Sequence, residues 1–315
     1  MLVASRLAWR MQRWEVIVLV GGSLLLAIVM SLVAWQLTIT RGAITSCIGD
    51  SAGGPLPLDC RSLVDWGNVM TAAGEILPTV AVGVPFVVGI LIGPPLVARE
   101  IEGRTAPIAW SLSRSRSRWL AWRLVPILLA VAVALLAVGA ASEALLLASR
   151  PDSPLGFANL GFHGPLIAVR GLAVFIMGVA VGLLLGRVLP AILVTGLLTI
   201  ALLGGLTFVR SEMMRSEATW VAVPPDGGNF STIYDSGWSD DATGEFVTYD
   251  QAFERFPEEF GPEGSWMPPG LTQVYLATPP ELYPAFVARE IGALAGFAII
   301  LAGVCAWLLN WRRPA

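Results

Sequence analysis

Long apolar runs alternate with short charged segments along this chain, which is the pattern of a protein that crosses a membrane several times. A spanning helix needs roughly 20 apolar residues, because each residue of an α-helix adds about 1.5 Å across about 30 Å of hydrocarbon. The apolar stretch 166–209 is too long for one crossing, and Gly186, Arg187 and Pro190 interrupt it, so it predicts two spans joined by a tight turn. The six predicted spans are Glu15–Leu37, Glu75–Ala98, Trp119–Leu147, Leu166–Gly186, Leu189–Val209 and Pro284–Leu309.

The arginines orient these spans, because cytoplasmic loops carry an excess of basic residues. Twelve of the 20 fall on one side of the predicted topology, in both termini, the link between the second and third spans, and the tight turn. They are Arg6, Arg10, Arg13, Arg99, Arg104, Arg114, Arg116, Arg118, Arg123, Arg187, Arg312 and Arg313. The other side holds the acidic segment 210–283, with 13 Asp or Glu against three Arg. Both termini are therefore predicted to be cytoplasmic, in a multi-pass protein of the plasma membrane.

The first 14 residues predict a helix that lies in the membrane interface before the chain turns to cross. An apolar stripe at helical spacing runs beside a basic stripe, as in interfacial amphipathic helices. The stripes consist of Val3, Leu7, Met11 and Trp14, and of Arg6, Arg10 and Arg13. The alternative is a frayed, basic tail.

Composition excludes several functions. The chain is 55% hydrophobic and only 14% charged, far from the quarter charged that is typical of a soluble domain. It contains no Lys, which excludes a Walker-type ATPase site and a Schiff-base lysine. His163 is the single histidine, so a multi-histidine zinc site is excluded too. We therefore expect an all-α membrane protein with no catalytic residues, no metal site and no bound cofactor.

The stretch CIGDSAGGPLPLDC, residues 47–60, contains a G-x-S-x-G pattern around Ser51. A serine nucleophile in this pattern needs a strand, a helix and a sheet beneath it, and the outer loop 38–74 lacks the alternation of a sheet. A membrane-embedded hydrolase is thus a remote alternative.

Cys47 and Cys60 lie on the oxidising side, where a disulfide is favoured over two free thiols. Such a bond would close a loop of about 14 residues and contribute about 3 kcal/mol. Cys305, in the last span, is expected to be a packing residue.

The link between the second and third spans, LVAREIEGRTAPIAWSLSRSRSRWLAWRL, has a structured pattern. Arg99, Glu100, Glu102 and Arg104 form a mixed-charge cluster where the second span leaves the membrane. Thr105 can cap a short helix that carries Pro107 in its first turn and Ile108 and Leu112 on one face. Glu100 and Glu102 can pair with basic residues of a partner, or with Arg99 and Arg104. The succession of a charged cluster, a short amphipathic helix and a basic anchor indicates a docking surface for a cytoplasmic protein. Anchoring at the membrane accounts for SRSRSR, so no nucleic acid is expected.

This link resembles a motif in the membrane subunits of ABC exporters of the type V fold, in an actinobacterial-like branch. The matching residues are Leu96, Val97, Ala98, Arg99, Glu100, Glu102, Thr105, Ala109, Trp110, Arg116, Arg118, Trp119 and Leu120. The chain departs from the pattern at three places: Leu112 stands where the family often has Gln, Arg104 where many members have Gly, and Pro94-Pro95 where an apolar start is usual.

The resemblance implies an exporter whose ATP and Mg are bound by a separate ABC ATP-binding subunit. It implies a coupling helix within residues 99–118, and a second copy of the chain in the bilayer. An amphiphilic substrate (a drug, antibiotic, peptide or lipid) would move outward along a path lined by the second and fifth spans. The residues implied at the ATPase interface are Arg99, Glu100, Glu102, Arg104, Thr105, Ile108, Trp110, Leu112, Arg116 and Arg118. A membrane-anchored sensor or scaffold whose outer segment binds a ligand is the alternative function.

Phe86, Thr195 and Thr199 are candidates for the substrate path. The alternatives are that Phe86 packs on lipid or helices, and that the threonines bond to their own helix.

Residues 210–283 contain many aromatic residues, which a disordered acidic loop would not need. We expect them to form a small ordered cap of short helices and turns outside the membrane, between a first region, 1–209, and the last span with its tail, 284–315.

Overall fold

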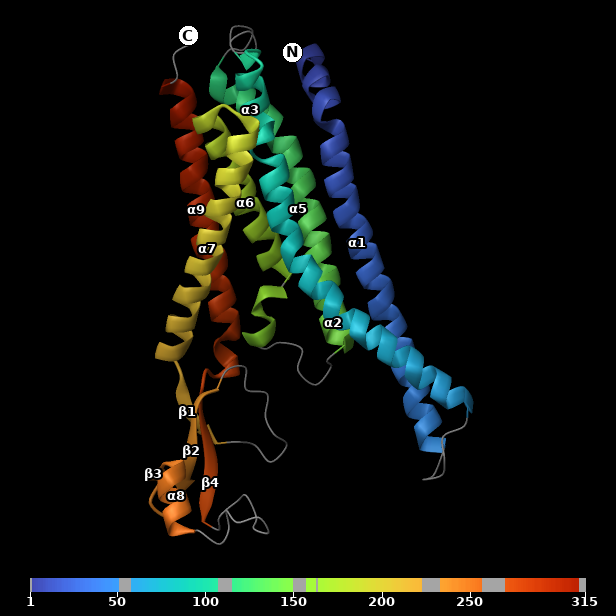
Figure 1. The fold of residues 1–315 in the computed structure, drawn as a ribbon, viewed down its shortest axis with the longest axis vertical. Helices are drawn as coiled ribbons and strands as arrows, with labels where there is room; N and C mark the ends of the chain where they lie inside the picture. Colours follow the sequence, from blue (N-terminus) through green and yellow to red (C-terminus); the bar gives the residue numbers. More distant parts are fainter. Residues whose placement is uncertain are drawn as a thin grey trace. The chain divides into compact units, whose positions relative to one another are not determined.

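The computed structural model describes residues 2–50, 58–106, 115–149, 157–162, 164–222, 233–256 and 270–311. Within these residues, six helices are long and apolar enough to cross a membrane (Figure 1). The chain divides into two compact units. The helical unit comprises 1–154, 161–202 and 287–315, and the second unit comprises 155–160 and 203–286.

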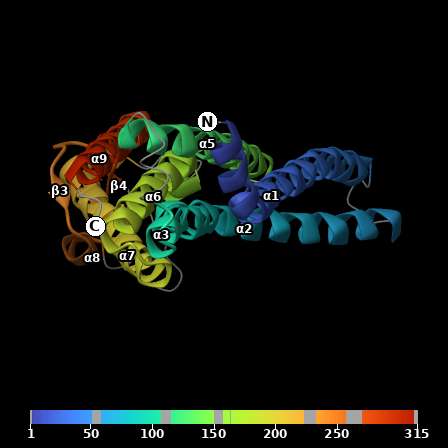
Figure 2. The same cartoon turned by 90° about the horizontal axis from the view of Figure 1, so that it is seen from above.

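The helical unit is built around one buried helix, α6. The other helices of this unit pack around it or on one another: α6 contacts α2, α3 and α5, and α1 packs on α2 and α5 (Figure 2). Phe175 and Leu183 of α6 join Leu135 of α5 in the main apolar core. The helices are α1 (Leu2–Asp50), α2 (Leu58–Ile92), α3 (Pro95–Glu102), α5 (Arg116–Ser149), α6 (Gly164–Leu185), α7 (Val188–Ser216) and α9 (Tyr283–Trp311), with a 3-10 turn at Phe157–Phe162.

Each predicted span falls on one of the six long apolar helices, but the helix ends differ from the prediction. Most of the predicted loop 38–74 is helical, because α1 continues to Asp50 and α2 begins at Leu58. Pro78 and Pro85 lie inside α2 without ending it, as membrane helices tolerate. The helix breaks at Gly93-Pro94 instead. The predicted interfacial helix is not confirmed as a separate element, since the residues from Leu2 onward run continuously into the first span.

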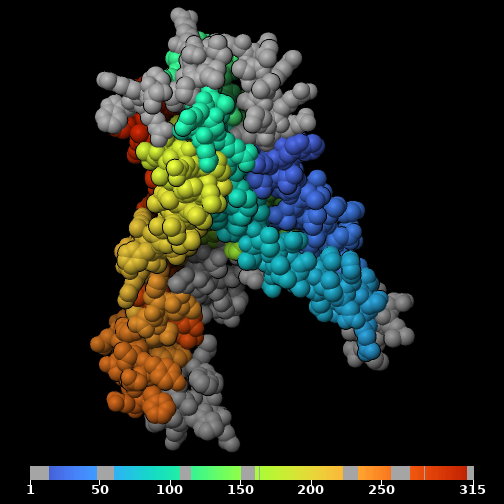
Figure 3. Space-filling model, turned by 45° about the horizontal axis from the view of Figure 1, so that its top comes forward, coloured from blue at the N-terminus to red at the C-terminus, as the bar shows by residue number. Residues whose placement is uncertain are grey.

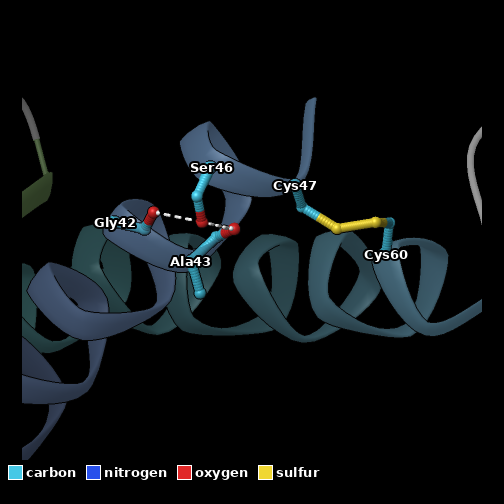
Figure 4. Close-up of a disulfide and its surroundings, with 5 residues drawn as sticks. All are labelled: Gly42, Ala43, Ser46, Cys47 and Cys60. Carbon is cyan, nitrogen blue, oxygen red and sulfur yellow. Dashed lines mark hydrogen bonds between the residues drawn. A yellow bond between two sulfur atoms is a disulfide. The ribbon is translucent and has the colours of Figure 1, made fainter. Parts of the chain in front are cut away.

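A disulfide joins the outer extensions of α1 and α2. Cys47 lies in α1 and Cys60 in α2, with their Cα atoms 6.1 Å apart, and the bond connects the two helices side by side (Figure 4). Beside it, the Ser46 hydroxyl lies within hydrogen-bonding distance of the carbonyls of Gly42 and Ala43 in its own helix. Ser51 lies outside the described residues.

The second unit contains a β-sheet, so the prediction of short helices and turns for it is wrong, whereas the membrane-spanning part is helical as expected. Four antiparallel strands run in the order β1-β4-β2-β3. Their bounds are β1 (Thr219–Ala222), β2 (Ile233–Asp240), β3 (Phe246–Val247) and β4 (Leu271–Ala277). α8 (Tyr249–Arg255) starts at a capping box formed by Thr248 and Gln251, and its Ala252 packs with Trp238 and Leu271. The strands are rich in Trp, Tyr, Val and Thr, residues that favour extended structure. They are too short for their alternation of apolar and polar residues to be recognised in the sequence.

Glycines allow α2 and α3 to lie directly against the backbone of α6. A Cβ on Gly89 would come within 2.8 Å of Val174 Cγ1 and 2.9 Å of the Phe175 amide nitrogen. A Cβ on Gly182 would lie 2.6 Å from the Pro94 carbonyl oxygen. Small residues at such positions let membrane helices approach closely, and dispersion contacts then stabilise the pair.

We predict that Gly89→Ala lowers the midpoint temperature of unfolding in detergent. The added methyl group meets the backbone of α6, which cannot move aside as a side chain can, and overpacking of this kind costs about 1–3 kcal/mol. Gly83→Ala in the same helix is the matched control, because no atom lies within 4 Å of its added Cβ. Equal midpoints for the two variants would contradict the close contact between α2 and α6 at Gly89.

We predict that Cys47→Ser lowers the midpoint of thermal unfolding under oxidising conditions, by the loss of about 3 kcal/mol of chain-entropy stabilisation. A reductant should lower the wild-type midpoint to that of the variant and leave the variant unchanged. Ser46→Ala, one residue away on the exposed side of α1, is the control and should retain the wild-type midpoint. A wild-type midpoint that does not respond to reduction would refute a stabilising role for this bond.

Candidate functional site at the end of α3

α3 is a short helix with a buried first half and a charged second half. It follows the break at Gly93-Pro94, and Pro95 occupies its first position, where the missing N–H costs nothing. Residues 95–98 are buried, and α3 packs on α6. The charged residues that follow are thereby fixed to a rigid part of the bundle.

The charged residues of α3 each bond to a different helix. Arg99 pairs with Glu15 of α1 at 2.5 Å, and Glu100 pairs with Arg123 of α5. The Glu102 carboxylate accepts a hydrogen bond from the amide of Val188, the first residue of α7, at 3.0 Å. In the space-filling view, α3 lies beside the surface of α6 and the start of α7 (Figure 3). Three residues that the sequence assigned to a partner interface are thus bonded inside the chain.

α3 ends at Glu102, and Thr105 and Arg104 supply the bonds that close its last turn. The Thr105 amide donates to the Glu100 carbonyl at 3.0 Å and the Arg104 amide donates to Ile101 at 3.2 Å, which is the pair of bonds of a Schellman C-cap. Arg104 takes a φ of +55°, in the left-handed region that favours glycine. Glycine would adopt this backbone conformation without steric cost.

The far side of the link begins at α5. The Ser115 hydroxyl accepts the Arg118 amide at 3.2 Å, as an N-cap residue does, and the Arg118 side chain is exposed. Arg116 donates to the Leu309 carbonyl near the end of α9, at 3.2 Å. The predicted docking residues Ile108, Trp110 and Leu112 lie within 107–114, outside the described residues.

Seven of the ten predicted interface residues are described, and they lie at one end of the helical unit. Four of them, Arg99, Glu100, Glu102 and Arg116, bond to other helices. Their bonding partners were missed by sequence reasoning. Glu15 and Arg123 were read as span boundary and membrane anchor, and a backbone amide such as that of Val188 carries no sequence signal. The clue that was present is the placement of both charges next to the ends of apolar runs.

The predicted substrate-path residues do not meet at an open cavity in the described structure. Thr195 and Thr199 are buried, and each hydroxyl donates to the carbonyl four residues earlier, at 2.7 Å. Phe86 is half-buried in α2. Their place in a path remains a prediction. An apolar groove of about 300 Å³ lies instead between α1 and α2, lined by Val18, Leu19, Gly22, Ser23, Val80, Gly83, Val84, Val87 and Val88.

A buried ion pair connects α6 to α9. Arg170 donates to Glu290 through Nε at 2.8 Å and Nη2 at 2.5 Å, and its Nη1 reaches the Gly161 carbonyl at 3.4 Å. Both side chains are only 9% exposed. An ion pair within membrane helices is costly to separate, so it holds α9 to α6.

Residues 20–210 match the family described as ABC-2 membrane transporter related. The chain belongs to this family. The match includes α3, the whole link to α5 and most of α7, so the charged end of the bundle is part of the shared region. The four strands lie beyond it. No curated protein and no solved structure shows a significant match to the chain.

Membership in the ABC-2 family and the six apolar helices identify a multi-pass membrane protein of the ABC transporter permease type. Permeases of this type function with an ABC ATP-binding subunit and are generally not catalytic themselves. The absence of Lys from the sequence agrees with this, since the chain lacks the phosphate-binding lysine of a P-loop.

We predict that Arg104→Gly raises the midpoint temperature of unfolding. A non-glycine residue in the left-handed region costs about 1–2 kcal/mol, and glycine removes this cost. Arg118→Gly is the matched control, because Arg118 is an exposed arginine in the helical first turn of α5, where glycine costs about 1 kcal/mol. In thermal unfolding, the midpoint should rise for Arg104→Gly and fall for Arg118→Gly. A lower midpoint for Arg104→Gly would show that the Arg104 side chain stabilises the fold by more than its left-handed backbone conformation costs.

Proposed function

We propose that this chain is the transmembrane subunit of an ABC exporter that moves an amphiphilic substrate outward with ATP hydrolysed by a separate subunit. The observation that carries the proposal is the anchoring of the link between α3 and α5. On one side α3 is bonded to α1, α5 and α7, and on the other Arg116 is bonded to α9. A partner that presses on residues 107–114 would act directly on four membrane helices.

The orientation is proposed from the same end of the bundle. The beginning of α1, α3 and the last turns of α9 lie at this end of the helical unit (Figure 1). The basic residues of the sequence gather in these segments, and basic residues favour the cytoplasm. We therefore place both termini and the link in the cytoplasm of a plasma-membrane protein, where ATP and Mg would be bound by the partner subunit.

A second copy of the chain is part of the proposal. α7 exposes Leu189, Leu193, Leu197 and Ile200, each between 61% and 70% accessible. Their spacing of three or four residues places them on one side of the helix. This apolar face fits either lipid or another copy, and the fifth span is the element that the family resemblance assigns to the central path.

We predict that the double variant Ile108→Ala with Trp110→Ala uncouples the transporter. Truncating buried apolar anchors at a protein interface commonly costs 2 kcal/mol or more, a loss of about 30-fold in affinity. The variant should insert normally but should not support substrate-stimulated ATP hydrolysis or efflux in vesicles that contain the ATPase subunit. Ser117→Ala is the control; Ser115 is unsuitable because its hydroxyl caps α5.

Normal efflux by the double variant at wild-type expression would refute the coupling role of this link. Co-purification separates the exporter from the alternative of a sensor or scaffold. A stoichiometric ABC ATP-binding subunit on the affinity-tagged wild-type chain supports the exporter, whereas a chain that purifies without one from its native membrane contradicts it.

A further inference from the structure

The first turn of α7 is bonded to a side chain that lies 86 residues earlier in the sequence. α6 and α7 are connected by Gly186 and Arg187 alone, and Gly186 takes a φ of +63°. The first amides of any helix have no acceptor within the helix and carry partial positive charge. Glu102 of α3 supplies a carboxylate to the Val188 amide at 3.0 Å. It therefore serves as the N-cap of a helix to which it does not belong.

α7 exposes a face of large apolar residues and buries a stripe of small ones, Ala191, Thr195 and Thr199. The turn before it contains a glycine, so the turn itself allows rotation. The Glu102–Val188 bond is consequently a specific polar connection between α7 and the charged segment.

α3, by contrast, is held firmly. A Cβ on Gly178 would lie 2.6 Å from Pro94 Cδ, so the residue just before α3 sits against α6 without a gap. Glu100 is partly buried with Arg123 of α5. Movement of α3 relative to these neighbours would be a rigid displacement of the whole helix, and the Glu102 carboxylate would carry the start of α7 with it.

We propose that Glu102 is the positioning residue through which α3 moves α7. This rests on the proposed function, because it assigns the internal route by which ATP-driven movement of the coupling link reaches the fifth span. Glu102 acts through the backbone of Val188 rather than by contact with the ATPase subunit or the substrate. The bond is at the exposed end of the bundle, so its contribution is that of an ordinary helix cap rather than of a buried charge pair.

The test uses the full chain reconstituted with its ATPase subunit in proteoliposomes, and the readout is substrate transported per ATP hydrolysed. Glu102→Ala should lower this ratio by about fivefold, which corresponds to the typical contribution of a helix cap, while the ATPase subunit still co-purifies. Glu102→Gln should retain most of the ratio, since the amide oxygen can still accept the Val188 N–H. Glu212→Ala, an exposed carboxylate near the other end of α7, is the control and should match the wild type.

A wild-type ratio in Glu102→Ala would overturn the proposal and leave the exporter function intact. Loss of the ATPase subunit from Glu102→Ala, but not from Glu102→Gln, would also overturn it, because Glu102 would then face the partner. Failure of the wild-type chain to transport would instead overturn the proposed function, and the inference with it.

A second variant keeps the proposal falsifiable if Glu102→Ala does not fold. Glu102→Cys with Arg187→Cys introduces one thiol at the end of α3 and one directly before Val188, the residue that Glu102 bonds. Mass spectrometry of the oxidised double variant checks that the two thiols have joined before transport is compared. Oxidation should raise the transport-to-ATP ratio above that of the reduced double variant, since the new disulfide replaces the lost bond. The wild type, reduced and oxidised in parallel, corrects for the native Cys47–Cys60 bond. No difference between the two states of the double variant would refute transmission between α3 and α7.

Discussion

Helix ends are the costly points of this protein, because the first amides and the last carbonyls of a helix have no partners within the helix. Charged side chains from other helices fill this need at both ends of the bundle. Acids accept from helix N-termini and arginines donate to helix C-termini, in agreement with the helix dipole. Four such contacts among the described residues are Glu143 with the Gly164 amide, Glu102 with the Val188 amide, Arg41 with the Ser149 carbonyl and Arg116 with the Leu309 carbonyl.

This constraint changes the meaning of a charged motif in a membrane protein. The residues Arg99, Glu100 and Glu102 would serve a partner interface equally well by sequence, and each is instead bonded to a helix of its own chain. In the proposed function their contribution to a partner would be indirect: they connect the end of α3 to other helices, so that a displacement of the link would reach those helices. The apolar residues of the link remain the proposed surface of contact.

The membrane-spanning part of the fold could be predicted from the sequence because the length and apolarity of a span are local properties. Helix limits could not, since residues 38–50 and 58–74 are too polar to be read as membrane and become helical where α1 packs on α2. The sheet was missed because β3 has two residues and β1 four, too few for alternation to be recognised. The bonds of the charged residues in α3 could not be predicted either, because Glu15 and Arg99, for example, are separated by 84 residues, a distance that no local pattern spans.

The bond between Arg116 and the Leu309 carbonyl has a consequence for biosynthesis. Arg116 opens α5, and Leu309 lies near the end of α9. The two residues are separated by 193 positions, so their contact can form only after α9 has been made and inserted. The amide of Val188 likewise reaches Glu102 only when α7 emerges. The end of the bundle around α3 is therefore completed late in synthesis, and a chain truncated before α9 would carry the charged motif without the framework that holds it.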